Sequence, residues 1–204
     1  MTSFKSTLID QAFVIKKAGI MTLIQDLGRF GSTHLGLTHS GAADKNAYNC
    51  ANQLLGNDEN AASLEIILGG LILQSNINTV IAITGAEMSF KLNGVEQENW
   101  RSYKIQKGDV LSFGYASKGI RSYLTVAGGF QIPKQFGSVS TVIREHIGGI
   151  DGGALKQAQC LPCSTVDTTQ IKLSSLPRKF QPDYQQEISL RVVLGYQCHM
   201  FTSA

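Results

Sequence analysis

Short apolar runs separated by glycine are the most regular pattern in the chain. Residues 79–84 (TVIAIT) form a continuous apolar run, which predicts a buried strand, and residues 88–92 (MSFKL) alternate, which predicts a half-exposed one. Residues 121–126 (RSYLTV) continue the strand pattern. Asn93-Gly94 suits the type I′ turn of a hairpin, and Lys107-Gly108-Asp109 before the run VLSF predicts a second hairpin.

One segment has helical periodicity instead. Within Asp44–Leu55, apolar residues recur at i, i+4, i+7 and i+8, and so form a single stripe. These residues are Ala47, Ala51, Leu54 and Leu55. Ser40 or Asp44 can cap the first amides, and Gly56 lies where a left-handed residue would end the helix. A second short helical turn is expected from Asp58.

These elements predict a mainly β fold with one or two helices. So many short strands leave few ways to hide sheet edges other than a closed or strongly curved sheet. We place this domain at residues 13–163. Residues 164–187 are rich in Ser, Thr, Gln and Pro and are interpreted as a linker. Alternation at Ile188, Leu190, Val192 and Leu194 predicts a further strand, and residues 188–204 are interpreted as the start of a truncated second domain.

Composition narrows the classes of protein. The 204 residues are 43% hydrophobic, which is typical of a globular protein. A formal net charge of +3, from 18 basic and 15 acidic residues, argues against a nucleic-acid surface. No apolar run approaches the roughly 20 residues of a membrane span. The start of the chain has no signal-peptide pattern, and four cysteines are too few for a disulfide framework, so the cytoplasm is the expected compartment.

The densest group of polar residues lies between Gln25 and Asp44. It contains Asp26, Arg29, His34, His39, Ser40 and Asp44. This glycine-rich segment leads into the expected helix, whose free amides and positive dipole end favour a carboxylate or phosphate. The structural alternative is that Asp26 pairs with Arg29 to fix the loop, while Ser40 and Asp44 cap the helix.

Other candidate chemistry is sparse. Glu65 is a charge beside an apolar strand, so it is either paired, with Arg121 or Arg144 as partner, or functional. Cys160 and Cys163 have the C-x-x-C spacing, but no second pair answers them, and no metal site is expected. The sequence has no phosphate-binding loop motif and no nucleophile elbow.

Several segments together resemble the biotin-dependent carboxyltransferase-like family. They are GIMTLIQDLGRFGSTHLGLTHSGAADKNAYNCANQLLGN, ASLEIILGG, AITGAEM, RSYLTVAGGF and GSVSTVIREHIGGIDGG, in this order, within residues 14–162. The family is also labelled allophanate hydrolase subunit 2, and it includes the C subunit of 5-oxoprolinase and the KipA regulator. The resemblance implies two cyclophilin-like β-barrel halves, of which this chain holds the first.

The resemblance also implies three functions. The C subunit of 5-oxoprolinase works with the A and B subunits to open 5-oxoproline at the expense of ATP. In a urea carboxylase of the allophanate pathway, the corresponding domain transfers a carboxyl group from biotin. KipA is a regulator that binds a kinase inhibitor. No biotinyl lysine motif accompanies this chain, so we expect a C-type subunit of a hydrolase complex, inactive alone, with A-like and B-like partner proteins.

Site residues follow from combining the resemblance with chemistry. The expected catalytic residues are Asp26, Asp44 and Glu65, which would orient a proton or a metal-bound nucleotide. The expected substrate-binding residues are Arg29, Ser40, Gly41 and Arg121, which would hold a small amide or carboxylate substrate. ATP with Mg²⁺ is expected in the assembled complex, and biotin only under the urea carboxylase alternative.

Overall fold

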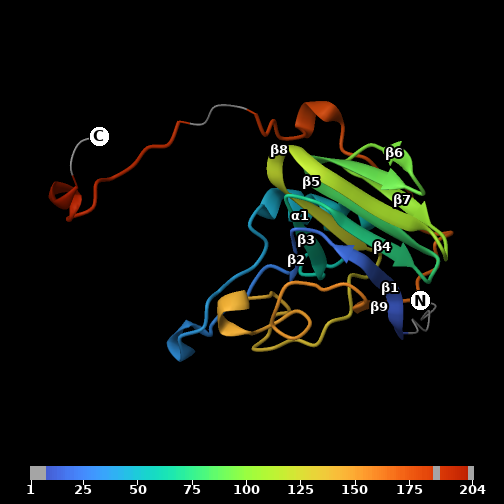
Figure 1. Cartoon of the computed structure of the whole chain (residues 1–204), viewed down its shortest axis with the longest axis horizontal. Coiled ribbons are helices and arrows are strands. Elements are labelled where there is room, and N and C mark those ends of the chain that lie inside the picture. The colour runs from blue at the N-terminus through green and yellow to red at the C-terminus, as the bar shows by residue number, and fades with distance from the viewer. Residues whose placement is uncertain (1–7, 186–188, 202–204) are drawn as a thin grey trace.

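The computed structural model describes residues 8–185 and 189–201, and most of them lie in or against one sheet (Figure 1). The strands are β1 (Leu8–Ala18), β2 (Met21–Gln25), β3 (Ser63–Ile67), β4 (Leu71–Ser75), β5 (Thr79–Leu92), β6 (Val95–Gln97), β7 (Arg101–Ile105), β8 (Val110–Val126) and β9 (Cys160–Ser164). The helix is α1 (Lys45–Leu55), and the short 3-10 helices are η1 (Thr33–Leu35), η2 (Ile143–Glu145), η3 (Arg178–Phe180) and η4 (Cys198–Met200).

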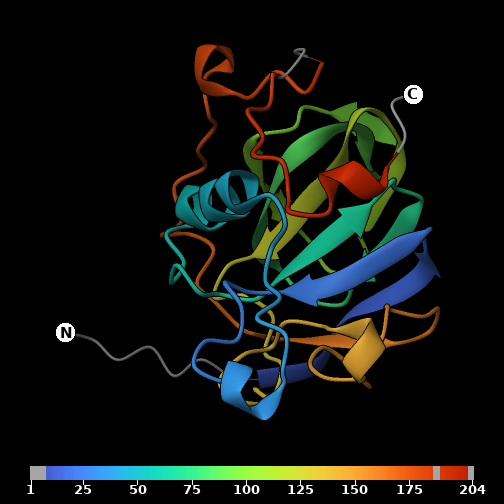
Figure 2. The ribbon, with the colours of Figure 1, turned by 90° about the vertical axis from the view of Figure 1, so that its left-hand side faces the viewer.

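The nine strands form a single curled sheet around an apolar core. Its main path runs β2-β3-β8-β4-β1-β9, and β5 joins it by pairing with β8, β6 and β7. Strand β8 is long enough to pair with β3, β4 and β5, which bends the sheet into a barrel-like shape (Figures 1 and 2). The expected mainly β fold is therefore confirmed.

Two details of the strand prediction need correction. The runs expected as separate strands form one strand, β5, whose register shifts after Gly85 at φ 91°. Asn93 and Gly94 adopt positive φ values of 52° and 81°, as a type I′ turn requires. The prediction of a second hairpin, around residues 107–109, is wrong, because β7 pairs with β5 and not with β8. Strand β8 already has β5 on one edge and β3 and β4 on the other.

Helix α1 lies on the outside of β5 and β8 (Figure 2). Asp44 caps it, since its carboxylate accepts the Ala47 amide at 3.0 Å, and Gly56 ends it at φ 66°. The Ser40 hydroxyl donates to the Thr141 carbonyl instead and is not the cap. Residues 58–61 form a single turn closed by the Ala61 amide and the Asp58 carbonyl, so a turn begins at Asp58 as expected but does not continue into a helix.

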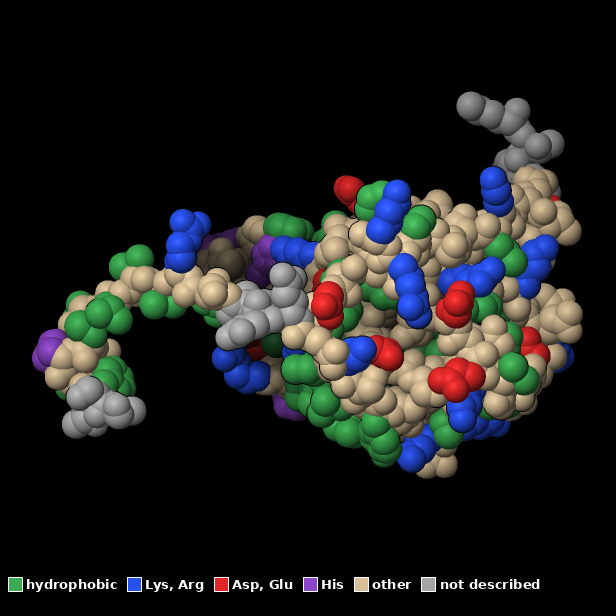
Figure 3. Space-filling model, turned by 90° about the horizontal axis from the view of Figure 1, so that it is seen from above, with side chains coloured by type: hydrophobic (Ala, Val, Ile, Leu, Met, Phe, Trp, Pro, Cys, Tyr) green, Lys and Arg blue, Asp and Glu red, His purple; other side chains and the backbone are tan. Residues whose placement is uncertain are grey.

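The segment after β9 stays close to the sheet as far as residue 185. The Ser102 amide donates to the Ser174 carbonyl and the Leu176 amide donates to the Trp100 carbonyl, both at 2.9 Å. Residues 189–195 contain no strand, because no sheet edge lies beside them within the described residues, and Ile188 lies outside those residues. Hydrophobic side chains are exposed along this segment (Figure 3). Its assignment to a second domain stays a prediction.

Within residues 8–185 and 189–201, no helix is long and apolar enough to cross a membrane.

Candidate functional site

Two long connections meet at one end of the sheet. The early loop, residues 26–43, joins β2 to α1, and the late loop, residues 127–159, joins β8 to β9. Figures 1 and 2 both place η1 of the early loop and η2 of the late loop at this end. Most of the polar residues singled out in the sequence belong to these loops or to the strands beneath them.

Asp26 is fully buried and ties the two loops together. Its Oδ1 accepts the Gly28 amide at 2.8 Å and the hydroxyls of Ser138 and Ser140, each at 2.6 Å. Its Oδ2 accepts the Val139 amide at 2.8 Å. Four neutral donors thus compensate the carboxylate, which explains why the late loop carries the run Ser-Val-Ser at residues 138–140.

Arg29 is also buried, and all its partners are backbone carbonyls. Its guanidinium donates to Gln135 at 3.1 Å, to Ser140 at 3.0 Å and to Thr38 at 3.5 Å. The expected direct pair with Asp26 is wrong, because the two charges are joined only through Ser140. We call Asp26, Arg29 and these late-loop partners the Asp26 network. Its contacts give Asp26 and Arg29 a structural role in fixing the loop, although not through the direct pair, and ligand binding by Asp26 or Arg29 stays a prediction.

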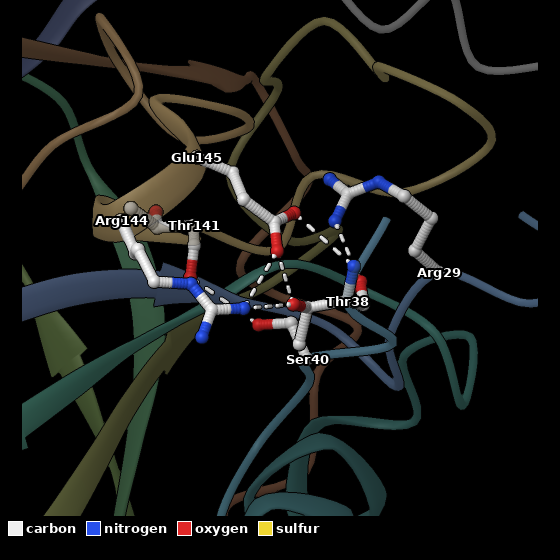
Figure 4. Close-up of polar contacts among 6 residues, drawn as sticks. All are labelled: Arg29, Thr38, Ser40, Thr141, Arg144 and Glu145. Carbon is white, nitrogen blue, oxygen red and sulfur yellow. Dashed lines mark hydrogen bonds and ion pairs between the residues drawn. The ribbon is translucent and has the colours of Figure 1, made fainter. Parts of the chain in front are cut away.

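A second contact joins the loops nearer the surface (Figure 4). The Thr38 amide donates to Glu145 Oε2 at 3.1 Å, and the Thr38 hydroxyl donates to Glu145 Oε1. These two donors lower the pKa of the Glu145 carboxyl. Arg144 donates to the Thr38 hydroxyl and to Glu145, each at 3.1 Å. Arg144 is therefore not the partner of Glu65.

Ser40 and Gly41 shape the end of the early loop. Gly41 adopts φ 99°, and a Cβ there would lie 2.6 Å from the Leu27 carbonyl oxygen, so the position requires glycine. The next amide, of Ala42, donates to the Asp26 carbonyl at 2.9 Å. Both residues thus have a structural task, and their assignment to substrate binding stays a prediction.

A separate network surrounds Glu65, which β3 holds in a buried position. Its Oε2 accepts the Tyr123 hydroxyl at 2.6 Å and the Ala43 amide at 3.0 Å. Its Oε1 lies 3.5 Å from Nε of Arg121, on β8. Of the two partners that the sequence suggested, Arg121 is thus the correct one. The carboxylate sits at the amide just before α1, a position that favours negative charge.

The network continues through two tyrosines toward the cap of α1. The Asp44 amide donates to the Tyr123 oxygen at 2.8 Å, and the Tyr184 hydroxyl donates to the Asp44 carboxylate at 2.7 Å. Burial and the neighbouring carboxylates, Glu65 and Asp44 respectively, raise the pKa of both tyrosines, so both stay protonated at neutral pH. We call Glu65, Arg121, Tyr123, Asp44 and Tyr184 the Glu65 network.

Sequence reasoning missed both tyrosines. Tyr123 could have been found, because it lies two residues from Arg121 on one strand, and residues two apart share a face. It also pairs directly with Glu65 across β3 and β8. Tyr184 comes from the expected linker, and no local pattern in that segment predicts its contact with Asp44.

Arg121 differs from Arg29 in what its guanidinium can still do. Its side chain is 38% exposed, and within the described residues it makes an ion pair with Glu65 but no hydrogen bond. Its outer donors can therefore receive an anion from solvent, in the planar geometry that suits a carboxylate. Substrate binding by Arg121 and a catalytic role for Glu65 stay predictions.

Two further features complete the description. A cavity of about 880 Å³ lies between β5, β6, β8 and residues 175–184, and Tyr184 is part of its wall. Cys160 and Cys163 lie on β9, where burial raises the pKa of the Cys163 thiol. Among the described residues, no group of three or more His, Cys, Asp or Glu side chains could hold a metal ion.

Comparison with known families and proteins gives a consistent picture. Residues 35–204 match the family described as "Carboxyltransferase domain, subdomain A and B". The chain is 41% identical over 156 residues to the C subunit of 5-oxoprolinase from Haemophilus influenzae, covering 76% of this chain and 50% of that protein. It is 39% identical over 150 residues to the Escherichia coli protein of the same name, covering 72% and 48%.

A solved structure supports the same relationship. The urea carboxylase of Kluyveromyces lactis superimposes with a TM-score of 0.78 at 30% identity, over 89% of this chain and 17% of that one. The chain spans about half the length of the curated relatives it matches, since it covers 50% and 48% of the two 5-oxoprolinase proteins.

Proposed function

Because the chain belongs to the carboxyltransferase-domain family, subdomains A and B, we propose that it is the C-type subunit of an ATP-dependent 5-oxoprolinase complex. Its similarity to the C subunits of two bacterial 5-oxoprolinases supports this assignment. The proposal includes A-like and B-like partner proteins and keeps the cytoplasm as the compartment. The chain alone is then inactive.

The observation that carries the proposal is the partly exposed guanidinium of Arg121, which pairs with buried Glu65 and keeps donors that no described residue uses. 5-Oxoproline has one carboxylate, and a guanidinium with unused donors can hold it through two parallel hydrogen bonds. Glu65 holds Arg121 through their ion pair, and the protonated Tyr123 hydroxyl donates a hydrogen bond to Glu65. In this proposal Arg121 binds the substrate, and Glu65 and Tyr123 orient it.

The described residues at the N-terminal end of α1 do not fit a site for ATP and Mg²⁺. A phosphate would favour the N-terminal end of α1, but the Glu65 carboxylate already takes the Ala43 amide there, and Asp44 takes the Ala47 amide. A phosphate at that end would also meet two carboxylates. We therefore assign nucleotide binding to the partner proteins and derive no step through ATP in this chain.

Reconstitution tests the proposal. The chain is combined with the A-like and B-like proteins, and glutamate formation from 5-oxoproline is measured together with ATP consumption. We expect glutamate release only in the complete mixture, and a large fall in turnover for Arg121→Ala. A complete mixture that consumes no 5-oxoproline would contradict the proposal.

A urea carboxylase component is the second candidate, because the Kluyveromyces lactis urea carboxylase shares the fold over 89% of this chain. Under this alternative, biotin on a carrier would deliver the carboxyl group. The discriminating measurement is urea-dependent loss of carboxyl from carboxybiotin in the presence of the chain. Carboxyl transfer without 5-oxoproline turnover would favour this candidate.

A further inference from the structure

Four large apolar side chains project into solvent from the two loops. Phe30 is 66% exposed and Phe136 54% exposed, and Leu35 and Ile143 are also exposed. We call these four residues the loop patch. Phe30 and Leu35 belong to the early loop, and Phe136 and Ile143 to the late loop. Exposed apolar side chains on two loops that contact each other are candidates for an interaction surface on a folded protein.

Buried contacts hold the loop patch in place. Arg29 directly precedes Phe30, and its guanidinium donates to the carbonyl of Gln135, which directly precedes Phe136. Phe30 also packs edge-on against His39, with ring centroids 4.1 Å apart. A surface that is already ordered loses less conformational entropy when it binds. The loops thus present fixed aromatic anchors, the kind of residue that dominates protein interfaces.

The second contact between the loops fixes the other pair of residues. Thr38 follows η1, which contains Leu35, and Glu145 lies in η2 with Ile143. The amide and hydroxyl of Thr38 both donate to Glu145. Because Glu145 is turned inward, its side chain is only 15% exposed.

The exposed charged side chains nearest the loop patch in the sequence are basic. Lys134 is exposed two residues before Phe136, and the Arg144 side chain, next to Ile143, is 82% exposed, while Asp151 is an exposed acid farther along the late loop. Between residues 27 and 43 there is no acidic residue, and between residues 130 and 147 Glu145 is the only one. A partner that fits this surface therefore has an apolar centre and carboxylates at its edge.

We propose that the loop patch is the docking surface for a partner protein of the complex, one with an apolar contact surface rimmed by carboxylates. The inference rests on the proposed function for the identity of that partner. It assigns the Asp26 network a purpose: the network holds the loops that carry the patch, while the Glu65 network serves the substrate.

Binding of purified components tests the proposal. The full chain is titrated with the A-like and B-like proteins, and the dissociation constant is measured at two salt concentrations. The double variant Phe30→Ser/Phe136→Ser removes both aromatic anchors and is expected to bind about 100-fold more weakly. Arg144→Glu is expected to weaken binding about 10-fold, and less so at high salt.

The matched control is Val95→Ser/Tyr115→Ser, two exposed apolar residues on β6 and β8. It is expected to bind within about twofold of the wild type, because surface substitutions outside an interface change little. The thermal midpoint of every variant is measured, and since all five substituted side chains are exposed, the midpoints are expected to stay close to that of the wild type.

The outcomes separate the inference from the proposed function. If the complex forms and turns over but the loop-patch variant binds like the control, the inference is overturned and the function stands. If the wild-type chain binds neither partner, both are overturned. If the patch instead mediates self-association that the double variant abolishes, a second copy is the occupant and the inference is wrong.

Discussion

Two buried carboxylates at the same end of the sheet differ in whether a cation lies beside them. Asp26 accepts four hydrogen bonds from neutral groups and contacts no cation directly within the described part of the chain. Glu65 accepts from a hydroxyl and an amide and also faces the Arg121 guanidinium at 3.5 Å. Burial alone therefore does not distinguish a structural charge from a functional one.

The arginines make the same distinction more clearly. Each hydrogen bond that the Arg29 guanidinium makes within the described residues goes to a backbone carbonyl. Arg121 keeps outward donors that no described residue uses. A ligand can bind only to donors that the fold has not consumed. The contacts of the Asp26 network are therefore structural, and only Arg121 of the Glu65 network keeps donors for the ligand proposed above.

The largest expected effect is that of Asp26→Asn on stability. Asparagine keeps one acceptor oxygen and replaces the other with an NH2 group, so one of the two donors, from Ser138 or Val139, then faces another donor, and the acceptor that remains carries no charge. We expect a loss of about 3 kcal/mol in the free energy of unfolding, at the upper end for unpaired buried groups. Denaturant titration measures it. A loss well below about 1 kcal/mol would break the comparison.

Tyr123→Phe is expected to have an intermediate effect. It removes the hydroxyl that joins Glu65 to the Asp44 amide, and both groups are then left short of a partner. We expect a loss of about 1–2 kcal/mol. The pKa of Tyr123 is raised above its ordinary 10.0. The contribution of its hydroxyl to the free energy of unfolding is therefore complete below pH 10 and is lost as the pH rises above that value. The variant should lack this alkaline loss, as a pH series of unfolding curves would show.

Tyr184→Phe is expected to have a smaller effect. The substitution breaks only the bond to the Asp44 carboxylate, and this carboxylate is partly exposed and can be solvated. We expect a loss of about 0.5–1 kcal/mol, measured by thermal unfolding. Loosening of residues 174–184 would appear as faster amide hydrogen exchange there. Unchanged exchange would show that the tyrosine does not hold this segment.

The smallest expected effect concerns Glu145 at low pH. Its pKa is lowered below the ordinary 4.5, so its contribution is complete above that value and is lost as the pH falls through the lower, folded-state pKa. Glu145→Gln should remove this acid-dependent part, so the variant is slightly less stable than the wild type at neutral pH and the difference shrinks as the pH falls. Loop exchange rates measured between neutral and acid pH test this. An identical acid response in both proteins would contradict it.

The sequence predicted most of the fold because the relevant signals are local. The apolar stripe, the Asp44 cap and Gly56 define α1, and Asn93-Gly94 defines one hairpin. It failed at the second hairpin, because the pairing of β7 depends on which strand edges remain free. That is a property of the whole sheet and not of residues 107–113.

The candidate site was predictable in part. Arg121 was one of the two partners named for Glu65, because a charge beside a buried strand needs a partner, but the sequence could not choose between Arg121 and Arg144. Asp26 and Arg29 were placed in the right loop, but their true partners lie more than 100 positions away, around residues 135–140. No local pattern shows that a distant Ser-Val-Ser segment and its carbonyls will satisfy both charges.

One paired measurement tests the central distinction most directly. Arg29→Lys and Arg121→Lys are each assembled with the partner proteins, and the thermal midpoint and turnover are measured on the same samples. Lysine keeps the charge but loses the planar fork. We predict that Arg29→Lys loses about 1–3 kcal/mol of stability with turnover per folded molecule intact, and that Arg121→Lys loses turnover with its midpoint unchanged. The reverse pattern, with turnover lost in Arg29→Lys at an unchanged midpoint, would contradict the account.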